Sequence, residues 1–200
     1  EDASTIRAEC YLPVREDSGP HWGFKLFAQE REIPLREVHP WYRQGQSPRT
    51  FYLKTMEPLG LTERFELRHA THGKVRVTFG NVFSSKEFQN TFHYDGDDLG
   101  VTYSPTKTSF KVWAPTATNL QVIIYTEGEG GSGVSTPMEL GSKGVWSASL
   151  KGDLEGKFYN FLVTHGEKTS EVVDPYAKAA GVNGQRGQII DLAKTNPIGW

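Results

Sequence analysis

Hydrophobic and polar residues alternate along much of the second half of the chain. Residues 110–114 alternate and stop at Pro115, and Leu120, Val122 and Ile124 repeat the same two-residue period. Successive side chains of a strand point to opposite faces, so this period predicts β-strands. Residues 145–150 and 158–163 predict two more strands, with turns at Lys151-Gly152-Asp153 and His165-Gly166 and a glycine-rich loop over residues 127–133.

The first half shows the same alternation less regularly. Trp22, Phe24 and Leu26 alternate, as do Phe65 and Leu67, and then Val75, Val77 and Phe79. These segments also predict strands. Two short stretches stand apart. Residues 84–94 fit a short helix, with capping-box spacing at Ser84 and Glu87, or nearly as well a strand, and residues 175–180 predict a helical turn capped by Asp174.

Composition supports an all-β fold and divides the chain in two. The 21 Gly and 11 Pro suit short strands separated by turns. Residues 1–93 hold nine Arg and four Lys, whereas residues 94–200 hold one Arg and eight Lys, and the segment 94–100 is rich in Gly and Asp. We therefore expect two small, immunoglobulin-like β-sandwich domains in tandem, residues 1–93 and 94–200, each of the usual sandwich size.

Length, charge and hydropathy exclude several classes of protein. Two hundred residues are too few for a complete (β/α)₈ barrel of about 250 residues. The net charge of −2 and the absence of a long basic stretch argue against a nucleic-acid partner. No apolar run approaches the ~20 residues that span a bilayer, so no membrane partner is expected. The chain begins at Glu1 without Met, which leaves a cytoplasmic and a secreted location equally open.

The side chains that carry chemistry form no recognisable catalytic or metal motif. Asp95, Asp97 and Asp98 offer carboxylates for Ca²⁺, but their spacing departs from the EF-hand loop and favours a solvated turn between domains. His69 and His72 lack a third zinc ligand, and the lone Cys10 is expected to be a small buried strand residue. No phosphate-binding glycine loop and no G-x-S-x-G motif occurs. We expect no metal and no cofactor, and a binding or structural module.

Exposed aromatic residues are the candidates for binding, because a pyranose ring offers its apolar C–H face to a π-system. If Phe110 and Val112 enter the core, Trp113 leaves it, and either stacks on a ligand or is covered by a neighbouring domain, the latter being favoured. Trp146 is expected in the core. Trp41 and Tyr42 lie in a polar, proline-flanked segment that resembles an exposed loop and a sugar platform.

Longer motifs in residues 94–200 resemble a known family. They are Tyr94-Asp95-Gly96, Leu99-Gly100-Val101, Phe110-Lys111-Val112-Trp113-Ala114-Pro115, Gly144-Val145-Trp146, Gly152-Asp153-Leu154-Glu155-Gly156 with Tyr159, Val173-Asp174-Pro175-Tyr176-Ala177-Lys178-Ala179, Val182-Asn183-Gly184 and the segment 191–200. Together they resemble the isoamylase-N-terminal-type carbohydrate-binding module of starch-debranching enzymes and its junction with the catalytic barrel in type I pullulanases. Residues 75–93 are more loosely similar to the end of an additional N-terminal starch-binding module of such enzymes.

The resemblance implies a non-catalytic α-glucan-binding or positioning region of an enzyme that hydrolyses α-1,6 branch points in pullulan and starch. Its partners would be maltooligosaccharide, pullulan or starch, and a catalytic barrel that Trp200 would lead into. The family's sugar-binding tryptophan and lysine are replaced here, with Glu167-Lys168 after the hairpin and Asn160 on the strand. The resemblance therefore places sugar binding in the first domain. The candidate residues are Tyr11, Trp41, Tyr42, Phe79 and Gly80, and those for an interdomain interface are Trp113, Lys111, Tyr176 and Trp200.

Three alternatives stay open. In the first, the two domains serve only to stabilise and position the barrel, without glucan binding. The 200 residues would be an enzyme in their own right if they hydrolysed pullulan alone, although no catalytic residue is assigned. A protein-binding β module is the general fallback for any fold of this kind.

Overall fold

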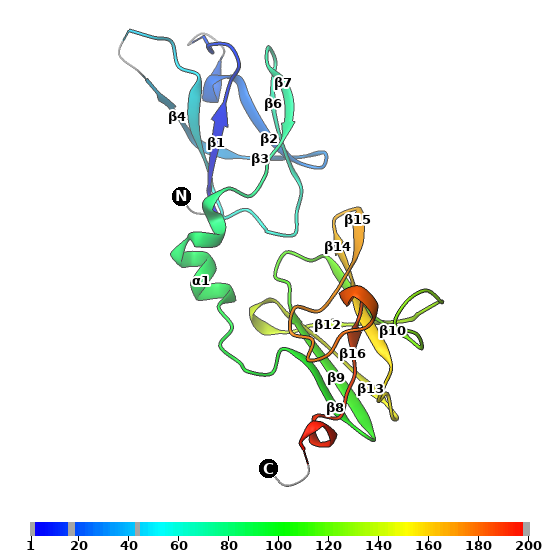
Figure 1. Ribbon diagram of the computed structural model, residues 1–200. Helices are drawn as coiled ribbons and strands as arrows, with labels where there is room; N and C mark the ends of the chain where they lie inside the picture. The colour runs from blue at the N-terminus through cyan, green and yellow to red at the C-terminus, as the bar shows by residue number, and fades with distance from the viewer. Residues whose placement is uncertain (1–2, 16–18, 43–44, 198–200) are drawn as a thin grey trace. The chain divides into compact units, whose positions relative to one another are not determined.

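The chain folds into two compact units, unit 1 from residue 1 to 91 and unit 2 from residue 92 to 200. The computed structural model describes residues 3–15, 19–42 and 45–197 of these (Figure 1). Composition placed the boundary after residue 93. The sheets of both units are antiparallel and strands are the main regular structure, so the predicted all-β fold is confirmed.

Unit 1 is a sandwich of two antiparallel sheets. Sheet A has the strand order β1-β5-β4, and sheet B has the order β3-β2-β6-β7 (Figure 1). The strands are β1 (Thr5–Glu9), β2 (Phe24–Ala28), β3 (Arg31–Ile33), β4 (Leu35–Trp41), β5 (Thr50–Thr55), β6 (Phe65–His69) and β7 (Gly73–Arg76).

The core of unit 1 lies between these sheets. Phe51 and Leu53 of β5 are fully buried and face Phe24 and Leu26 of β2 across the gap, with the Phe24 and Phe51 rings 5.0 Å apart. Each such side chain contributes about 1.5–3 kcal/mol by leaving water. Because strand side chains alternate, the burial of residues 51 and 53 turns Tyr52 outward.

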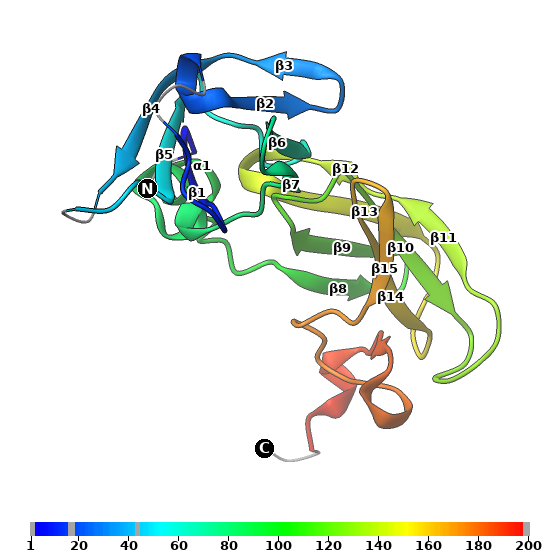
Figure 2. The ribbon, with the colours of Figure 1, turned by 90° about the horizontal axis from the view of Figure 1, so that it is seen from above.

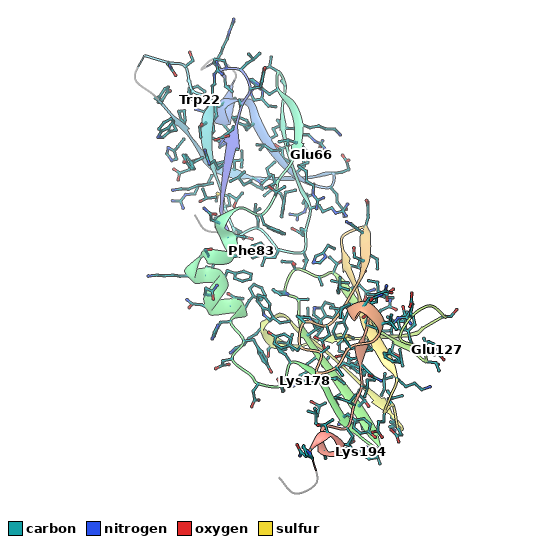
Figure 3. The ribbon with its side chains drawn as sticks, viewed as in Figure 1. Trp22, Glu66, Phe83, Glu127, Lys178 and Lys194 are labelled. Carbon is teal, nitrogen blue, oxygen red and sulfur yellow. The ribbon has the colours of Figure 1, made fainter. Side chains whose placement is uncertain are left out.

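A short helix, α1 (Lys86–Phe92), follows the sandwich of unit 1 in the chain. The helical alternative for residues 84–94 is therefore the right one. Its cap is Ser85 rather than Ser84, since the Ser85 Oγ accepts the Phe88 amide at 3.1 Å. Phe83 lies in the 3₁₀ turn Asn81–Ser84 just before α1 and packs against Phe88 with ring centroids 5.1 Å apart (Figure 3).

Unit 2 is a second antiparallel sandwich, seen from another side in Figure 2. Sheet C has the order β12-β13-β9-β8. Sheet D has the order β11-β10-β14-β15, and β16 also pairs with β14. The strands are β8 (Gly100–Ser104), β9 (Lys107–Trp113), β10 (Asn119–Tyr125), β11 (Val134–Pro137), β12 (Glu139–Leu140), β13 (Val145–Lys151), β14 (Phe158–His165), β15 (Lys168–Val172) and β16 (Gly187–Gln188).

The core of unit 2 confirms the inward-facing residues that the alternation predicted. Phe110 and Val112 of sheet C pack against residues of sheet D, including Tyr159, whose ring lies 5.2 Å from that of Phe110. Trp146 is buried as expected, and its indole N–H donates to the Ala114 carbonyl at 3.0 Å. Ile189, beyond the last strand, is also fully buried in this core.

Two positions in unit 2 require glycine, because another segment of the chain passes close to the backbone there. Gly100 has φ +95°, and a Cβ there would lie 2.9 Å from the Tyr176 Cβ. Gly144 has φ +76°, and its Cβ would lie 2.5 Å from the Pro115 Cβ. Both positions combine a left-handed backbone with a close neighbour, so only glycine fits them.

Local expectations fail where tertiary contacts override the pattern. Trp22 is not in a strand but in the 3₁₀ segment Pro20–Gly23, with φ +56°. The strand expected over residues 75–79 ends at Arg76. The turn expected at residues 175–180 is present but shorter, closed by the Ala177 amide on the Asp174 carbonyl, and Asp174 caps it as expected, since its carboxylate accepts the Tyr176 amide at 2.8 Å.

Candidate functional site

Trp41 is the last residue of β4, so the expectation of an exposed loop there is wrong. The strand contains Pro40, which has no amide hydrogen to donate. Strand β4 is an edge strand of sheet A, paired only on its β5 side, and an edge tolerates proline. The Trp41 side chain is 49% exposed.

Trp41 belongs to an outward-facing array on sheet A. The strand register aligns Glu9, Thr50 and Trp41 in one row across the sheet. The next row holds Arg7, Tyr52 and His39. Trp41 and Tyr52 are therefore diagonal neighbours on one face, at a spacing of about 7–8 Å between such positions.

This face carries a groove, which we call the sheet A groove. Its volume is about 490 Å³, within the range of small-ligand sites. Aromatic rings, hydroxyl groups and charged groups line it together. The lining residues are Arg7, Glu9, Trp41, Gln46, Ser47, Arg49, Thr50 and Tyr52.

The charges around the groove are largely matched. Arg7 forms an ion pair with Glu9, and Arg49 donates to the Tyr11 carbonyl at 3.3 Å. Glu37 pairs with Lys54 in the row that follows that of Tyr52 on this face. Its carboxylate oxygens lie 2.9 Å from the Lys54 Nζ and 2.9 Å from the His39 Nε2. The hydrogen bond from Lys54, followed by that from His39, lowers the pKa of Glu37, so this carboxylate stays ionised.

Tyr11 lies at a different place in unit 1. It follows β1 and is 91% exposed. It lines a second groove of about 440 Å³ between the edge strands β1 and β7, where Val75 is also exposed. Cys10, which is half-buried rather than buried as expected, lines this groove too, and partial burial raises the pKa of its thiol.

Phe79 and Gly80 line neither groove. The Phe79 ring packs edge-on against Phe83, with centroids 5.5 Å apart, and stays exposed. A Cβ at Gly80 would meet no atom within 4 Å, so the space beside this backbone is open. Tyr42 is exposed next to Trp41 but also lies outside both grooves. Tyr11 and Trp41 thus line different grooves, and the other three candidates line neither of these two.

Tyr52 and the polar residues of the sheet A groove were not among the candidates predicted from the sequence. The signal for Tyr52 was present, because Thr50 to Thr55 alternates polar and apolar residues around Phe51 and Leu53. Arg7 and Glu9 could not be predicted as neighbours of Trp41, since the pairing of β1 with β5 and of β5 with β4 brings them together, and the second of these pairings also places Arg49 nearby.

In unit 2, Trp113 leaves the core as its position predicts, with 39% of its surface exposed. Its indole N–H points to two backbone carbonyls, those of Phe92 at 2.9 Å and Lys143 at 3.0 Å. This bifurcated contact fixes the ring against its own unit. Tyr176 is 46% exposed, and Trp200 lies outside the described residues.

Lys111 takes part in a charged cluster near the start of unit 2. It forms an ion pair with Asp98, which also accepts the Tyr94 hydroxyl. The hydrogen bond to Lys111 lowers the pKa of Asp98, and the same contact raises the pKa of Lys111. Asp95 lies near Lys143 at 3.6 Å. Asp95 and Asp98 thus pair with lysines.

Asn160 occupies the outer face of sheet D, where it is buried. Its amide donates to the Glu171 carboxylate at 2.8 Å and to the Gln185 carbonyl at 2.9 Å. The Tyr125 hydroxyl reaches the same carboxylate oxygen, and the Arg186 guanidinium lies 3.4 Å from the centre of the Tyr125 ring. This part of sheet D is covered by the protein's own side chains.

Metal and membrane sites find no support in the structure. Within residues 3–15, 19–42 and 45–197, no group of three or more His, Cys, Asp or Glu side chains is arranged to hold a metal ion. Over the same ranges, no helix has the length and apolar character needed to cross a membrane.

Part of unit 2 matches a known family. Residues 98–177 match the family carbohydrate-binding module 48, the isoamylase N-terminal domain. The chain as a whole is similar to the N-terminal region of type I pullulanases, which confirms the resemblance stated from its motifs.

Two curated relatives give the extent of this similarity. A pullulanase of Bacillus subtilis (strain 168) is 36% identical over 124 residues, 62% of this chain and 17% of the relative. A pullulanase of Klebsiella pneumoniae is 37% identical over 101 residues, 46% of this chain and 9% of the relative. The chain thus spans a minor part of the relatives it matches.

Solved structures extend the likeness to both units. The pullulanase of Anoxybacillus sp. LM18-11 complexed with maltotetraose has a TM-score of 0.70 at 28% identity, covering 98% of this chain and 26% of that one. The pullulanase of Bacillus acidopullulyticus has a TM-score of 0.86 over the full length of this chain and 37% of its own. Its identity is 19%, so it supports the fold alone.

Proposed function

We propose that this chain is a non-catalytic, α-glucan-binding region of a pullulanase that hydrolyses α-1,6 branch points in pullulan and starch. The observation that carries the proposal is the match of residues 98–177 to a carbohydrate-binding module in a chain similar to pullulanases. A related pullulanase crystallised with maltotetraose makes α-glucan the ligand class to test.

Binding is assigned to unit 1. The rings of Tyr11, Trp41, Tyr42 and Phe79 are all exposed and Gly80 adjoins open space, but Tyr11 and Trp41 line different grooves, so the binding site is to be sought among these positions rather than formed by all of them. In unit 2 the indole N–H of Trp113 is held by backbone carbonyls, and Asn160 is buried and tied to Glu171. Unit 1 therefore exposes more aromatic rings than unit 2, where Trp113 and Tyr176 are the exposed candidates.

Isothermal titration calorimetry of the 200-residue chain tests this proposal. We expect heat of binding with maltotetraose, pullulan and β-cyclodextrin, and none with cellotetraose, whose β-linkages make it the matched control. No heat with any α-glucan at millimolar concentration removes the binding function. A reducing-sugar assay on pullulan is expected to show no turnover, and measurable turnover overturns the non-catalytic assignment.

A second candidate function is structural: unit 2 positions a catalytic barrel of the same parent enzyme. Trp113, Lys111, Tyr176 and Trp200 are the proposed contact residues. The exposed face of Trp113 favours this role, since its N–H is already bonded and leaves mainly ring surface for a neighbour. In the full-length enzyme, Trp113→Ala is then expected to reduce solubility or pullulan turnover without changing the glucan affinity of this region. Unchanged solubility and turnover would contradict the role.

A further inference from the structure

The sheet A groove combines aromatic and polar groups that the core of unit 1 does not use. Residues 6, 8, 51 and 53 of its strands fill the core, while Arg7, Tyr52 and Trp41 point away from it. We propose that this groove binds an internal stretch of a neutral α-glucan, with Trp41 and Tyr52 as the ring platform. This inference rests on the proposed function and names its site.

The ring pair suits a sugar. A pyranose has an apolar face of C–H groups and a rim of hydroxyls, so it requires an aromatic surface beside donors and acceptors. Trp41 and Tyr52 supply the surface from neighbouring strands. Between and beside them, Glu9 and the Thr50 hydroxyl accept hydrogen bonds and the guanidinium of Arg49 donates them.

The polar groups of the groove suit a ligand rich in hydroxyl groups. Arg7 and Glu9 form an ion pair, so donor and acceptor groups lie side by side in the lining, and Arg49 adds further N–H donors. Hydroxyl groups use both partners at once, because each hydroxyl donates and accepts.

Strand order makes the groove suitable for the middle of a polymer chain. The lining residues run from β1 to β4, and these are the two edge strands of sheet A. No further strand of the described chain closes the groove at either side. A glucan can therefore continue past both edges, so a chain end is not required for recognition.

This site is distinct from the other candidates. Tyr11 lines the groove between β1 and β7, and Phe79 lines neither groove. The proposal therefore assigns glucan binding to Trp41 and Tyr52 and none to Tyr11 or Phe79.

Calorimetry of single variants tests the assignment in the 200-residue chain. Trp41→Ala and Tyr52→Ala are each expected to weaken β-cyclodextrin and maltotetraose binding about tenfold or more, as for the loss of a central aromatic anchor. Tyr11→Ala and Phe79→Ala are expected to bind as the native chain does. Tyr176→Ala in unit 2 is the matched control, since this ring is about as exposed as that of Trp41.

The outcomes separate the two proposals. If the native chain binds no α-glucan, the proposed function itself fails. If it binds but Trp41→Ala keeps its affinity, or if Tyr11→Ala or Phe79→Ala loses it, the function stands and this site is wrong. If maltotetraose binds and β-cyclodextrin, which has no ends, does not, the open-ended groove is wrong.

Chemical-shift mapping covers the case in which Tyr52→Ala, on the central strand, does not fold. In ¹⁵N-labelled native chain, β-cyclodextrin is expected to shift the amide signals of residues 7, 9, 49, 50 and 52. Shifts confined to residues around Tyr11 or Phe79 overturn the proposal.

Discussion

Units 1 and 2 are both antiparallel sandwiches, but they use their outward-facing aromatic residues differently. In unit 1, Trp41 and Tyr52 point from sheet A into an open groove. In unit 2, Trp113 bonds to two backbone carbonyls and Tyr125 is covered by Arg186. A ring on the outer face of a sheet thus indicates a binding surface more strongly where it lines a groove than where neighbouring side chains cover it or backbone carbonyls hold it.

The strongest test of this contrast concerns the internal contacts of unit 2. Asp174 is buried and accepts the Tyr159 hydroxyl at 2.7 Å and the Tyr176 amide at 2.8 Å. Asp174→Ala leaves both donors unpaired, and we expect unit 2 to lose about 2–4 kcal/mol of unfolding free energy. Urea unfolding followed by tryptophan fluorescence measures the loss.

An exposed pair of the same chemistry is the control. The Tyr103 hydroxyl donates to the exposed Asp153 at 2.8 Å, a contact that helps raise the pKa of Tyr103 to about 12, after desolvation. Asp153→Ala is expected to cost less than about 1 kcal/mol. Equal losses for the two variants would show that burial of Asp174 is not what matters.

A smaller effect is expected from Trp113→Phe. The change keeps a ring but removes the indole N–H that reaches the Phe92 and Lys143 carbonyls. We expect a loss of about 1 kcal/mol in unfolding free energy. Tyr176→Phe, which alters another exposed ring of unit 2, is expected to stay within about 0.5 kcal/mol. A Trp113→Phe variant as stable as the native chain would mean that the ring is not held by its own unit.

Acid is expected to weaken unit 1 through His69. Its buried ring lies within 3.0 Å of the Trp22 carbonyl through Nε2, and Nδ1 accepts the Thr71 and His72 amides. Desolvation, with a smaller contribution from His72, lowers the pKa of His69. The unfolded chain therefore binds the proton more readily than the folded one, so stability is complete above about pH 6.5 and falls as the pH drops toward the folded-state pKa.

The expected result is a lower free energy of unfolding at pH 5 than at pH 8. NMR titration of the His69 imidazole measures its midpoint, and urea unfolding at pH 8 and pH 5 measures the stability. A midpoint at or above the ordinary histidine value would contradict the prediction.

The smallest expected change in stability is that of Trp41→Ala, within about 0.5 kcal/mol. Trp41 is half-exposed at the end of an edge strand, so its removal creates no cavity in the core. Thermal unfolding by circular dichroism measures the change. A large loss would place Trp41 among the structural aromatic residues and remove the contrast between the units.

The sequence predicted the elements whose pattern is local. Strands β9, β10, β13 and β14 follow from alternation alone, because their inward residues are large and apolar. Trp22 could not be placed in this way, since its left-handed backbone is supported by His69 and by the Phe51 ring 5.5 Å away, both distant in sequence. The same limit applies to the sheet A groove. Trp41 was recognisable as exposed, but its polar neighbours come from β1 and β5 and depend on strand pairing.

Several of the motifs that made unit 2 recognisable contain residues at which two distant segments of the chain come into close contact. Gly100 meets Tyr176, and Gly144 meets Pro115. Each pair joins two of the motifs read from the sequence. The resemblance therefore rested on positions that the fold of unit 2 requires, which explains why it supports the fold strongly and the sugar site only indirectly.

The burial of Ile189 bears on how a fragment of this protein should be cut. The family match ends at residue 177, yet Ile189 fills the core of unit 2 and its amide and carbonyl bond to Lys157 and Gly156. Strand β16 and Arg186 lie in the same stretch. An expression fragment that stopped at the end of the family match would lack part of its own interior, so residues 178–191 belong to the folding unit and not to a dispensable linker.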